Sequence, residues 1–225
     1  MNDSNRVIIE AWNTVLFEKF CRFRHLLVEG LSEHSDAALD RRRYSEGARV
    51  LDVGCGFGDS TLRIAKRVGP TGEAVGVDCA ESFIRAAEAE ARQKGVDNAR
   101  FVVGDAQGGD LRGPYDHAFA RFGTMFFEMA GLDMVSTMLR GAGFERVTFE
   151  RYDCDICIGS DIDDAIEFAM ALGPAGEIIR LAGAEGAKRK PQVVAALKET
   201  FASFARPDGI WAPSSTWFIT ATNPG

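Results

Sequence analysis

The stretch from Arg49 to Ser60, which reads RVLDVGCGFGDS, constrains the fold of this chain more than any other. An apolar run that ends at Val53 predicts a short β-strand, and Asp59-Ser60 is typical of a helix N-cap. Three glycines at 54, 56 and 58 lie between them. A strand, a glycine turn and a helix N-terminus let backbone N–H groups face an adenosine-bearing ligand. We expect Gly54 and Gly56 to lie against it, because a Cβ atom there would occupy its space.

The residues after this stretch alternate between predicted helices and strands. Apolar spacing and glycine stops predict helices at 59–68 and 81–94, and strands at 73–77, 101–103 and 115–121. This alternation indicates an α/β fold with a doubly wound, mostly parallel, Rossmann-like sheet. Ligands bind such a sheet at the carboxyl ends of its strands. The glycine loop, Asp78, Asp105 and Arg121-Phe122 all follow strand ends, so we expect them to converge there.

Asp78 ends the second predicted strand, 20 residues after Gly58. An acidic side chain at this point can accept hydrogen bonds from both ribose hydroxyls of a nucleoside. The alternative for Asp78 and for Asp105 is a solvent-facing acid. Both residues end apolar strands on the same sheet edge, which favours a ligand-binding role.

The N-terminal region, residues 1–48, contains a helical apolar stripe over 6–31 followed by a polar loop over 32–48. Two interpretations stay open for the stripe: a helix packed on the sheet, or a lid that lines a substrate mouth. Trp12 and Phe17 would line that mouth. His25 lies on the same segment, either as a structural histidine or as a general base.

The C-terminal part predicts a strand at 146–152, three helices and a final strand. The helices, at 161–172, 175–183 and 191–205, predict a cap over residues 161–210, with Pro191 in the first turn of the third. The final strand at 217–221, within the closing piece 211–225, is expected to be antiparallel. Residues 49–160 and 211–225 would then form one core.

Charge and cysteine content bear on partners and compartment. A net charge of −7 and a pI near 5.1 oppose binding to nucleic acid phosphates. No run of about 18 apolar residues predicts a membrane span, so we expect no membrane partner. Five scattered cysteines and the lack of a signal-peptide pattern favour the cytoplasm. Cys154 and Cys157 form a CxxC in an extended pattern that points them to opposite faces, so no metal site is expected.

Four motifs resemble one family, the class I S-adenosylmethionine-dependent methyltransferases. They are LDVGCGFGDS at 51–60, VGVD at 75–78, VVGDAQ at 102–107 and YDHAFARFGTMFF at 115–127. With the closing pieces, the resemblance covers most of the chain. It is strongest to the small-molecule branch that includes the quinone-biosynthesis C-methyltransferases.

The resemblance implies roles for cofactor-binding residues. Asp52 and the Gly54–Gly58 loop, with Cys55, would hold the methionine part of S-adenosylmethionine. Asp78 would bind the ribose, with Cys79 beside it, and Asp105 would accept from the adenine amino group next to the Ala106 N–H. The backbone at Arg121-Phe122 would face the methionine amine. Phe83 would lie on the adenine face, or else belong to the core.

The chain departs from the family after the fourth strand. The family has a helix and a fifth strand there, but here Phe126-Phe127 runs straight into Glu128, and a helix at 132–142 follows. Omitting a central strand would leave backbone groups unpaired. We expect a stretch on the order of 50 residues to be missing between Phe127 and Glu128. The alternative is a natural deletion that rearranges the sheet.

The resemblance implies methyl transfer by in-line displacement, with S-adenosylhomocysteine as product, and the acidic charge favours a small, partly apolar acceptor. Trp12, Phe17 and Phe126 would face the acceptor. A base would be His25 or, less favoured, His117. Two alternatives are a non-catalytic S-adenosylmethionine-binding module and an NAD-dependent oxidoreductase, whose Gly-x-Gly-x-x-Gly fingerprint differs from the Gly-x-Gly-x-Gly here. The acceptor atom and the oligomeric state are left open.

Overall fold

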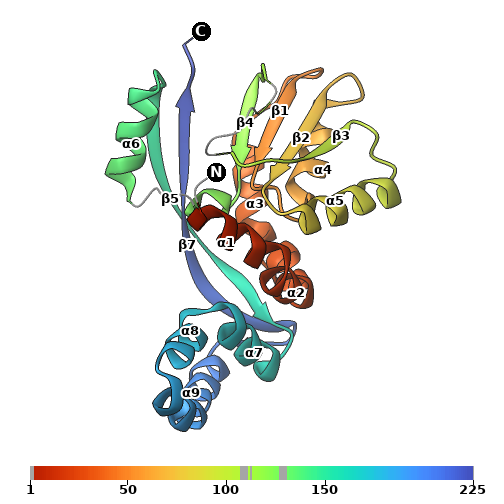
Figure 1. Ribbon diagram of the computed structural model, residues 1–225. Coiled ribbons are helices and arrows are strands. Elements are labelled where there is room, and N and C mark those ends of the chain that lie inside the picture. The colour runs from red at the N-terminus through yellow and green to blue at the C-terminus, as the bar shows by residue number, and fades with distance from the viewer. Residues whose placement is uncertain (1–2, 107–110, 112, 127–130, 225) are drawn as a thin grey trace. The chain divides into compact units, whose positions relative to one another are not determined.

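A computed structural model describes residues 3–106, 111, 113–126 and 131–224 (Figure 1). The chain divides into two compact units. Unit 1 consists of residues 1–17, 35–150 and 217–225, and unit 2 consists of residues 18–34 and 151–216.

The predicted parallel sheet lies in unit 1 and has four strands in the order β3-β2-β1-β4 (Figure 1). These strands are β1 Arg49–Val53, β2 Glu73–Asp78, β3 Ala99–Val103 and β4 His117–Ala120. Every neighbouring pair is parallel, with Leu51 opposite Val75 and Ala118. The carboxyl ends therefore meet at one edge, and the predicted parallel α/β fold is confirmed.

Two crossover helices connect these strands, α4 Asp59–Val68 and α5 Glu81–Lys94. Both helices end directly before the glycines that the sequence predicts as their stops. Gly95 has the left-handed φ of 61°, and its N–H bonds to the carbonyls of Ala91 and Arg92. This is the arrangement that commonly satisfies the last carbonyls of a helix.

Residues from alternate positions of the strands form two core clusters. The first contains Leu39, Ala48, Val50, Ile64, Ala65, Val68 and Ala74, and the second contains Leu51, Val75 and Val77. Each fully buried aliphatic side chain stabilises the fold by about 1.5–3 kcal/mol. The strand ends that carry the candidate site therefore project from a well-packed base.

The N-terminal region differs from the prediction. In place of one helix over 6–31 there are α1 Asp3–Asn13, α2 Val15–Arg22 and the π-helix η1 Leu26–Gly30. The predicted loop at 32–48 is wrong, because α3 spans Ser32–Arg41. This helix is polar on most sides. Arg67 of α4 donates to the Leu39 carbonyl and pairs with Asp40, so tertiary contacts stabilise a helix without a clear apolar stripe.

The C-terminal elements follow the predicted order. They are the 3-10 helix η2 Gly123–Phe126, α6 Leu132–Gly141, β5 Glu145–Gly159, α7 Ile162–Leu172, α8 Pro174–Leu181, α9 Gly183–Ala202, β6 Ala205–Arg206 and β7 Gly209–Thr222. The third cap helix starts earlier than predicted. Pro191 accordingly lies inside α9 rather than in its first turn.

The last strands form a sheet of their own. Its order is β5-β7-β6, and β6 is antiparallel to β7. The antiparallel final strand is therefore present, but the expectation that it extends the parallel sheet is wrong. In the part of the chain that the structure describes, β4 pairs with β1 alone and no fifth strand adjoins it.

Phe127 and Glu128, which would flank the missing stretch, lie outside the described residues. The missing stretch therefore stays a prediction. Across the ranges that are described, no helix is both long and apolar enough to span a membrane.

Candidate functional site

The glycine loop between β1 and α4 turns through left-handed backbone conformations. Gly54 has a φ of 68°, and a Cβ atom on it would lie 3.0 Å from the Cα atom of Gly123. Gly54 therefore allows two backbone segments to touch. Gly56 has a φ of 52°, and the nearest atom to a Cβ there would be Cδ1 of Phe83 at 4.0 Å. The space beside Gly56 is open, as a ligand-binding turn requires.

Asp78, at the end of β2, organises this loop through both carboxylate oxygens. Oδ2 accepts the N–H of Gly56 at 3.0 Å, and Oδ1 accepts the N–H of Ala80 at 3.0 Å. Burial raises the pKa of Asp78 above its ordinary value, although these hydrogen bonds oppose the shift. Asp78 thus joins the glycine loop to the turn that begins α5.

Asp52 lies beneath the loop and is 1% exposed. Its Oδ2 accepts hydrogen bonds from the hydroxyls of Ser60 at 2.7 Å and Thr61 at 2.6 Å. Among the residues that the structure describes, no group hydrogen-bonds to its buried Oδ1. Burial raises the pKa of Asp52 to about 6, against the lowering effect of the two hydroxyls. A buried oxygen without a partner is costly, so Oδ1 is suited to accept from a ligand cation.

Arg121 directly follows β4, and its guanidinium points to α4 rather than to open space. It pairs with Asp59 in a bidentate manner and donates to the Ser35 hydroxyl at 2.6 Å. Phe122 has a φ of 58°, a conformation that costs a side-chain-bearing residue about 1–2 kcal/mol. This strained backbone lies next to the Gly54–Gly123 contact, where a ligand-facing role was expected.

Asp105 and Ala106 follow β3, and the Gly104 N–H donates to the Asp78 carbonyl at 2.9 Å. This bond joins the ends of β2 and β3. Burial, followed by the charges of Asp78 and Asp105, raises the pKa of Cys79 to about 11. Burial also raises the pKa of Cys55 far above its ordinary value. Both thiols are therefore protonated at neutral pH and are poor nucleophiles.

Phe83 belongs to an aromatic cluster and is 3% exposed. Its ring centroid lies 5.0 Å from that of Phe17, 5.0 Å from that of Phe57 and 6.2 Å from that of Trp12. The N-terminal aromatics thus pack on the glycine loop and on α5, within unit 1. Phe126 ends η2, and its side chain lies outside the described part of the chain.

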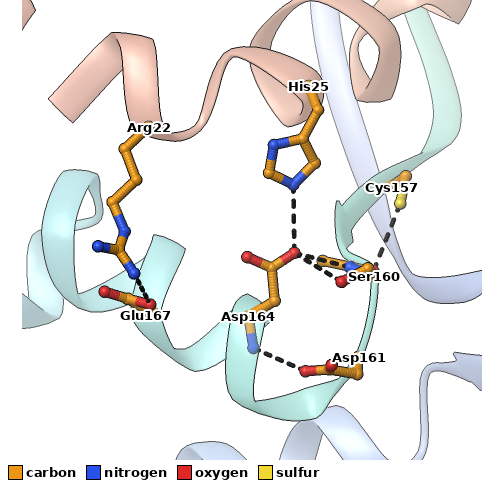
Figure 2. Close-up of polar contacts among 8 residues, drawn as sticks. Arg22, His25, Cys157, Ser160, Asp161, Asp164 and Glu167 are labelled. Atoms are coloured by element: carbon orange, nitrogen blue, oxygen red, sulfur yellow. Dashed lines mark hydrogen bonds and ion pairs between the residues drawn. The ribbon is translucent and has the colours of Figure 1, made fainter. Parts of the chain in front are cut away.

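His25 lies in unit 2, whereas the residues above lie in unit 1. In Figure 2 the His25 ring points toward Asp164. Its Nε2 atom lies 3.2 Å from Oδ2 of Asp164. The same Oδ2 accepts the N–H of Ser160 at 2.8 Å and the Ser160 hydroxyl at 3.1 Å. Burial would raise the pKa of Asp164, but the hydrogen bonds from Ser160 and His25 outweigh it and hold the pKa low. His25 is therefore oriented by a carboxylate that stays ionised.

The other candidates have structural partners. His117 Nδ1 lies 3.1 Å from Nη2 of Arg42, and its ring packs edge-on against Tyr44. The sulfur of Cys157 donates to the Gly159 carbonyl, and Cys154 lies 3.6 Å from the His34 ring nitrogens. Among the described residues, no cluster of His, Cys, Asp and Glu is suited to a metal.

Several site residues were not predicted from the sequence. Ser60 and Thr61 hold Asp52, and their place in the first turn after the glycine loop was the available signal. Gly123 was also missed. Its sequence signal is a glycine directly after the residues that follow the fourth strand.

Comparison with known proteins finds similarity over one part of the chain. Residues 44–121 match a family model described as a methyltransferase domain. Nocamycin O-methyltransferase of Saccharothrix syringae is 46% identical over 59 residues, which cover 26% of this chain and 21% of that relative. Demethylmenaquinone methyltransferase of Geobacillus kaustophilus (strain HTA426) is 35% identical over 66 residues, covering 29% and 28%.

One solved structure, that of the YcgJ protein from Bacillus subtilis, has the same fold. It superposes with a TM-score of 0.57 at 16% identity over 86% of this chain and 100% of that chain. The matches to the two curated relatives span less than a third of their lengths. The family match contains β1, β2, β3 and β4 with the glycine loop, Asp78 and Asp105. Over residues 44–121 the chain is therefore similar to methyltransferase domains, and over a shorter stretch to a demethylmenaquinone methyltransferase.

Proposed function

We propose that this chain transfers a methyl group from S-adenosylmethionine to a small, partly apolar acceptor and releases S-adenosylhomocysteine. The observation that supports this most is the unpartnered Oδ1 atom of Asp52, buried under a glycine loop that Asp78 holds open. A ligand with a cationic amine at one end and a ribose at the other matches these two carboxylates.

Different residues at the sheet edge would bind different parts of the cofactor. Asp52 would accept from the methionine amine, together with the backbone at Arg121-Phe122. Asp78 would accept from the ribose hydroxyls. Asp105 would accept from the adenine amino group, with the Ala106 N–H beside it. Phe83 would contribute the edge that faces Gly56, since the rest of its ring is covered by Phe17, Phe57 and Trp12.

The bound sulfonium would supply an already activated methyl group. The protein therefore mostly needs to align the acceptor in line and to exclude water. Trp12 and Phe17 are suited to the second task, because both are apolar and pack on the glycine loop region. With Phe126, they favour an acceptor that is itself partly apolar.

A base is needed only if the acceptor atom carries a proton that must leave. We propose His25 for that step, because Asp164 orients its ring through Nε2. The net charge of −7 supports a small-molecule partner over a nucleic acid.

Two measurements test the function. Calorimetric titration should show S-adenosylhomocysteine binding and no NAD binding. The reverse result would favour the oxidoreductase. Incubation with S-adenosylmethionine and a panel of hydroxylated, aminated and quinol-type aromatic acceptors should then release S-adenosylhomocysteine. Tight binding without turnover on any acceptor would favour the non-catalytic module.

A further inference from the structure

Helix α5 begins without a cap of its own. Its N-cap residue is Ala80, which makes no side-chain cap hydrogen bond. The first N–H groups of a helix have no partner inside the helix. Asp78 accepts the N–H of Ala80. The N–H of Ser82, in the first turn of α5, donates its hydrogen bond to a residue of a different helix.

Asn13, the last residue of α1, supplies the missing cap. Its Oδ1 accepts the Ser82 N–H at 3.0 Å, and its backbone carbonyl accepts the Ser82 hydroxyl at 2.9 Å. Its Nδ2 donates to the Ile9 carbonyl within α1 at 2.9 Å. The oxygen and the nitrogen of the Asn13 side-chain amide thus each make a hydrogen bond, and the residue joins the end of α1 to the start of α5.

The capping contact lies among the candidate cofactor residues. Ser82 directly precedes Phe83, and Asn13 directly follows Trp12, whose ring packs edge-on against Phe83 at 6.2 Å. Phe17 packs against Phe83 and, at 6.2 Å, against Phe57 of the glycine loop. The aromatics provide contact area, and Asn13 provides the directional bonds.

We propose that Asn13 is a positioning residue, which latches α1 to α5 and so sets the rate at which the cofactor leaves. This inference rests on the proposed function. While Asn13 caps Ser82, Trp12 and Phe17 stay packed on Phe83 and Phe57. Opening α1 leaves the Ser82 N–H without its acceptor and separates the Trp12 ring from Phe83, so the two contacts oppose opening together.

The test is the dissociation rate of S-adenosylhomocysteine, measured by stopped-flow tryptophan fluorescence. Asn13→Ala removes Oδ1 and should speed release about fivefold, the scale of one hydrogen bond. Asn13→Asp keeps an acceptor for the Ser82 N–H but loses the Nδ2 donor to the Ile9 carbonyl, so it should release more slowly than Asn13→Ala. Thr14→Ala is the matched control. It loses only the bond from the Thr14 hydroxyl to the Glu10 carbonyl within α1, so it should release at the wild-type rate.

Amide hydrogen exchange without ligand separates the latch from the proposed function. Asn13→Ala should speed exchange across α1, and Asn13→Asp should speed it less. A wild-type protein that binds no S-adenosylhomocysteine would refute the proposed function, while the exchange data would still report on the latch. Wild-type release and exchange rates in Asn13→Ala, or equal acceleration in Thr14→Ala, would overturn the latch.

Discussion

Arg121 and Asp59 form a two-pronged ion pair, with Nη1–Oδ2 at 2.9 Å and Nη2–Oδ1 at 3.0 Å. Their side chains are only 15% and 13% exposed. The pair joins the residue after β4 to the first residue of α4. It therefore stabilises the glycine loop from the β4 side, whereas Asp78 binds the loop through Gly56 from the β2 side.

Removing one member of this pair should destabilise the fold. Arg121→Met leaves the largely buried Asp59 charge unpaired, and we expect a loss of about 3 kcal/mol in the free energy of unfolding. Chemical denaturation measures this loss. Arg85→Met, which breaks an exposed pair with Glu81, is the control and should cost less than about 0.5 kcal/mol. Equal effects of the two variants would show that Arg121 does not brace the loop.

Gly56→Val should abolish cofactor binding and leave the fold largely intact. The new side chain would enter the open space beside the loop, while the positive φ costs about 1–2 kcal/mol. Gly95→Val is the matched control, because Gly95 has a φ of 61° and a Cβ atom there would meet no other atom within 4 Å. Calorimetry should show binding by the Gly95 variant only. Normal binding by Gly56→Val would move the ligand away from this loop.

Asp78→Ala should weaken S-adenosylhomocysteine binding by about 1.5–3 kcal/mol, the scale for hydrogen bonds to a charged group. The fold should also lose some stability, since the N–H groups of Gly56 and Ala80 lose their acceptors. Titration calorimetry and thermal melting separate the two effects. Asp97→Ala, at an exposed acid of the same unit, should change neither. Unchanged affinity in Asp78→Ala would remove Asp78 from the site.

The affinity for S-adenosylhomocysteine should depend on pH through Asp52. Its pKa in the folded protein is raised to about 6, so the carboxylate that the ligand amine needs is protonated below that pH. Affinity should therefore rise between about pH 5 and about pH 7, and Asp52→Asn should flatten this rise. Because the pKa of Asp52 is higher in the folded protein than in the unfolded chain, the free energy of unfolding of the wild type should fall as the pH rises from about 4 to about 6. An unchanged pH profile in Asp52→Asn would exclude Asp52 as the amine partner.

If the acceptor loses a proton during transfer, His25→Gln should lower kcat about 100-fold while leaving S-adenosylhomocysteine affinity unchanged. Asp164→Asn should have a smaller effect on kcat, since it only orients the ring. Steady-state kinetics on an acceptor from the panel measures both. A kcat for His25→Gln equal to that of the wild type would leave His25 with a structural role in unit 2.

The elements that sequence analysis predicted well carry local signals. Three of the four parallel strands, β1, β2 and β3, are apolar runs that end at aspartate or directly before glycine, and α5 stops at Gly95. The helix α3 was missed because it has no periodic apolar stripe: it places Leu39 in the core, and Arg63 and Arg67 of α4 pair with its Asp36 and Asp40. No local pattern records such contacts.

In the candidate site, too, features with a local sequence signal were predictable and long-range contacts were not. Asp78 was predictable because it ends a strand at a known distance from the glycines. The capping of Ser82 by Asn13 was not, because the two residues are 69 positions apart and one bond involves a backbone carbonyl. The oriented pair of His25 and Asp164 spans 139 positions, so sequence analysis found the histidine but not its partner.

The division of the chain into units has a consequence for evolution and for protein engineering. Residues 18–34 and 151–216 make up unit 2, and each segment is flanked on both sides by unit 1. Trimming either terminus therefore cannot isolate either unit. Insertions or deletions that reach α2, α3, β5 or β7 alter both units at once, because the chain passes from one to the other within these four elements. Homologues are thus expected to exchange the two segments of unit 2 as a matched set.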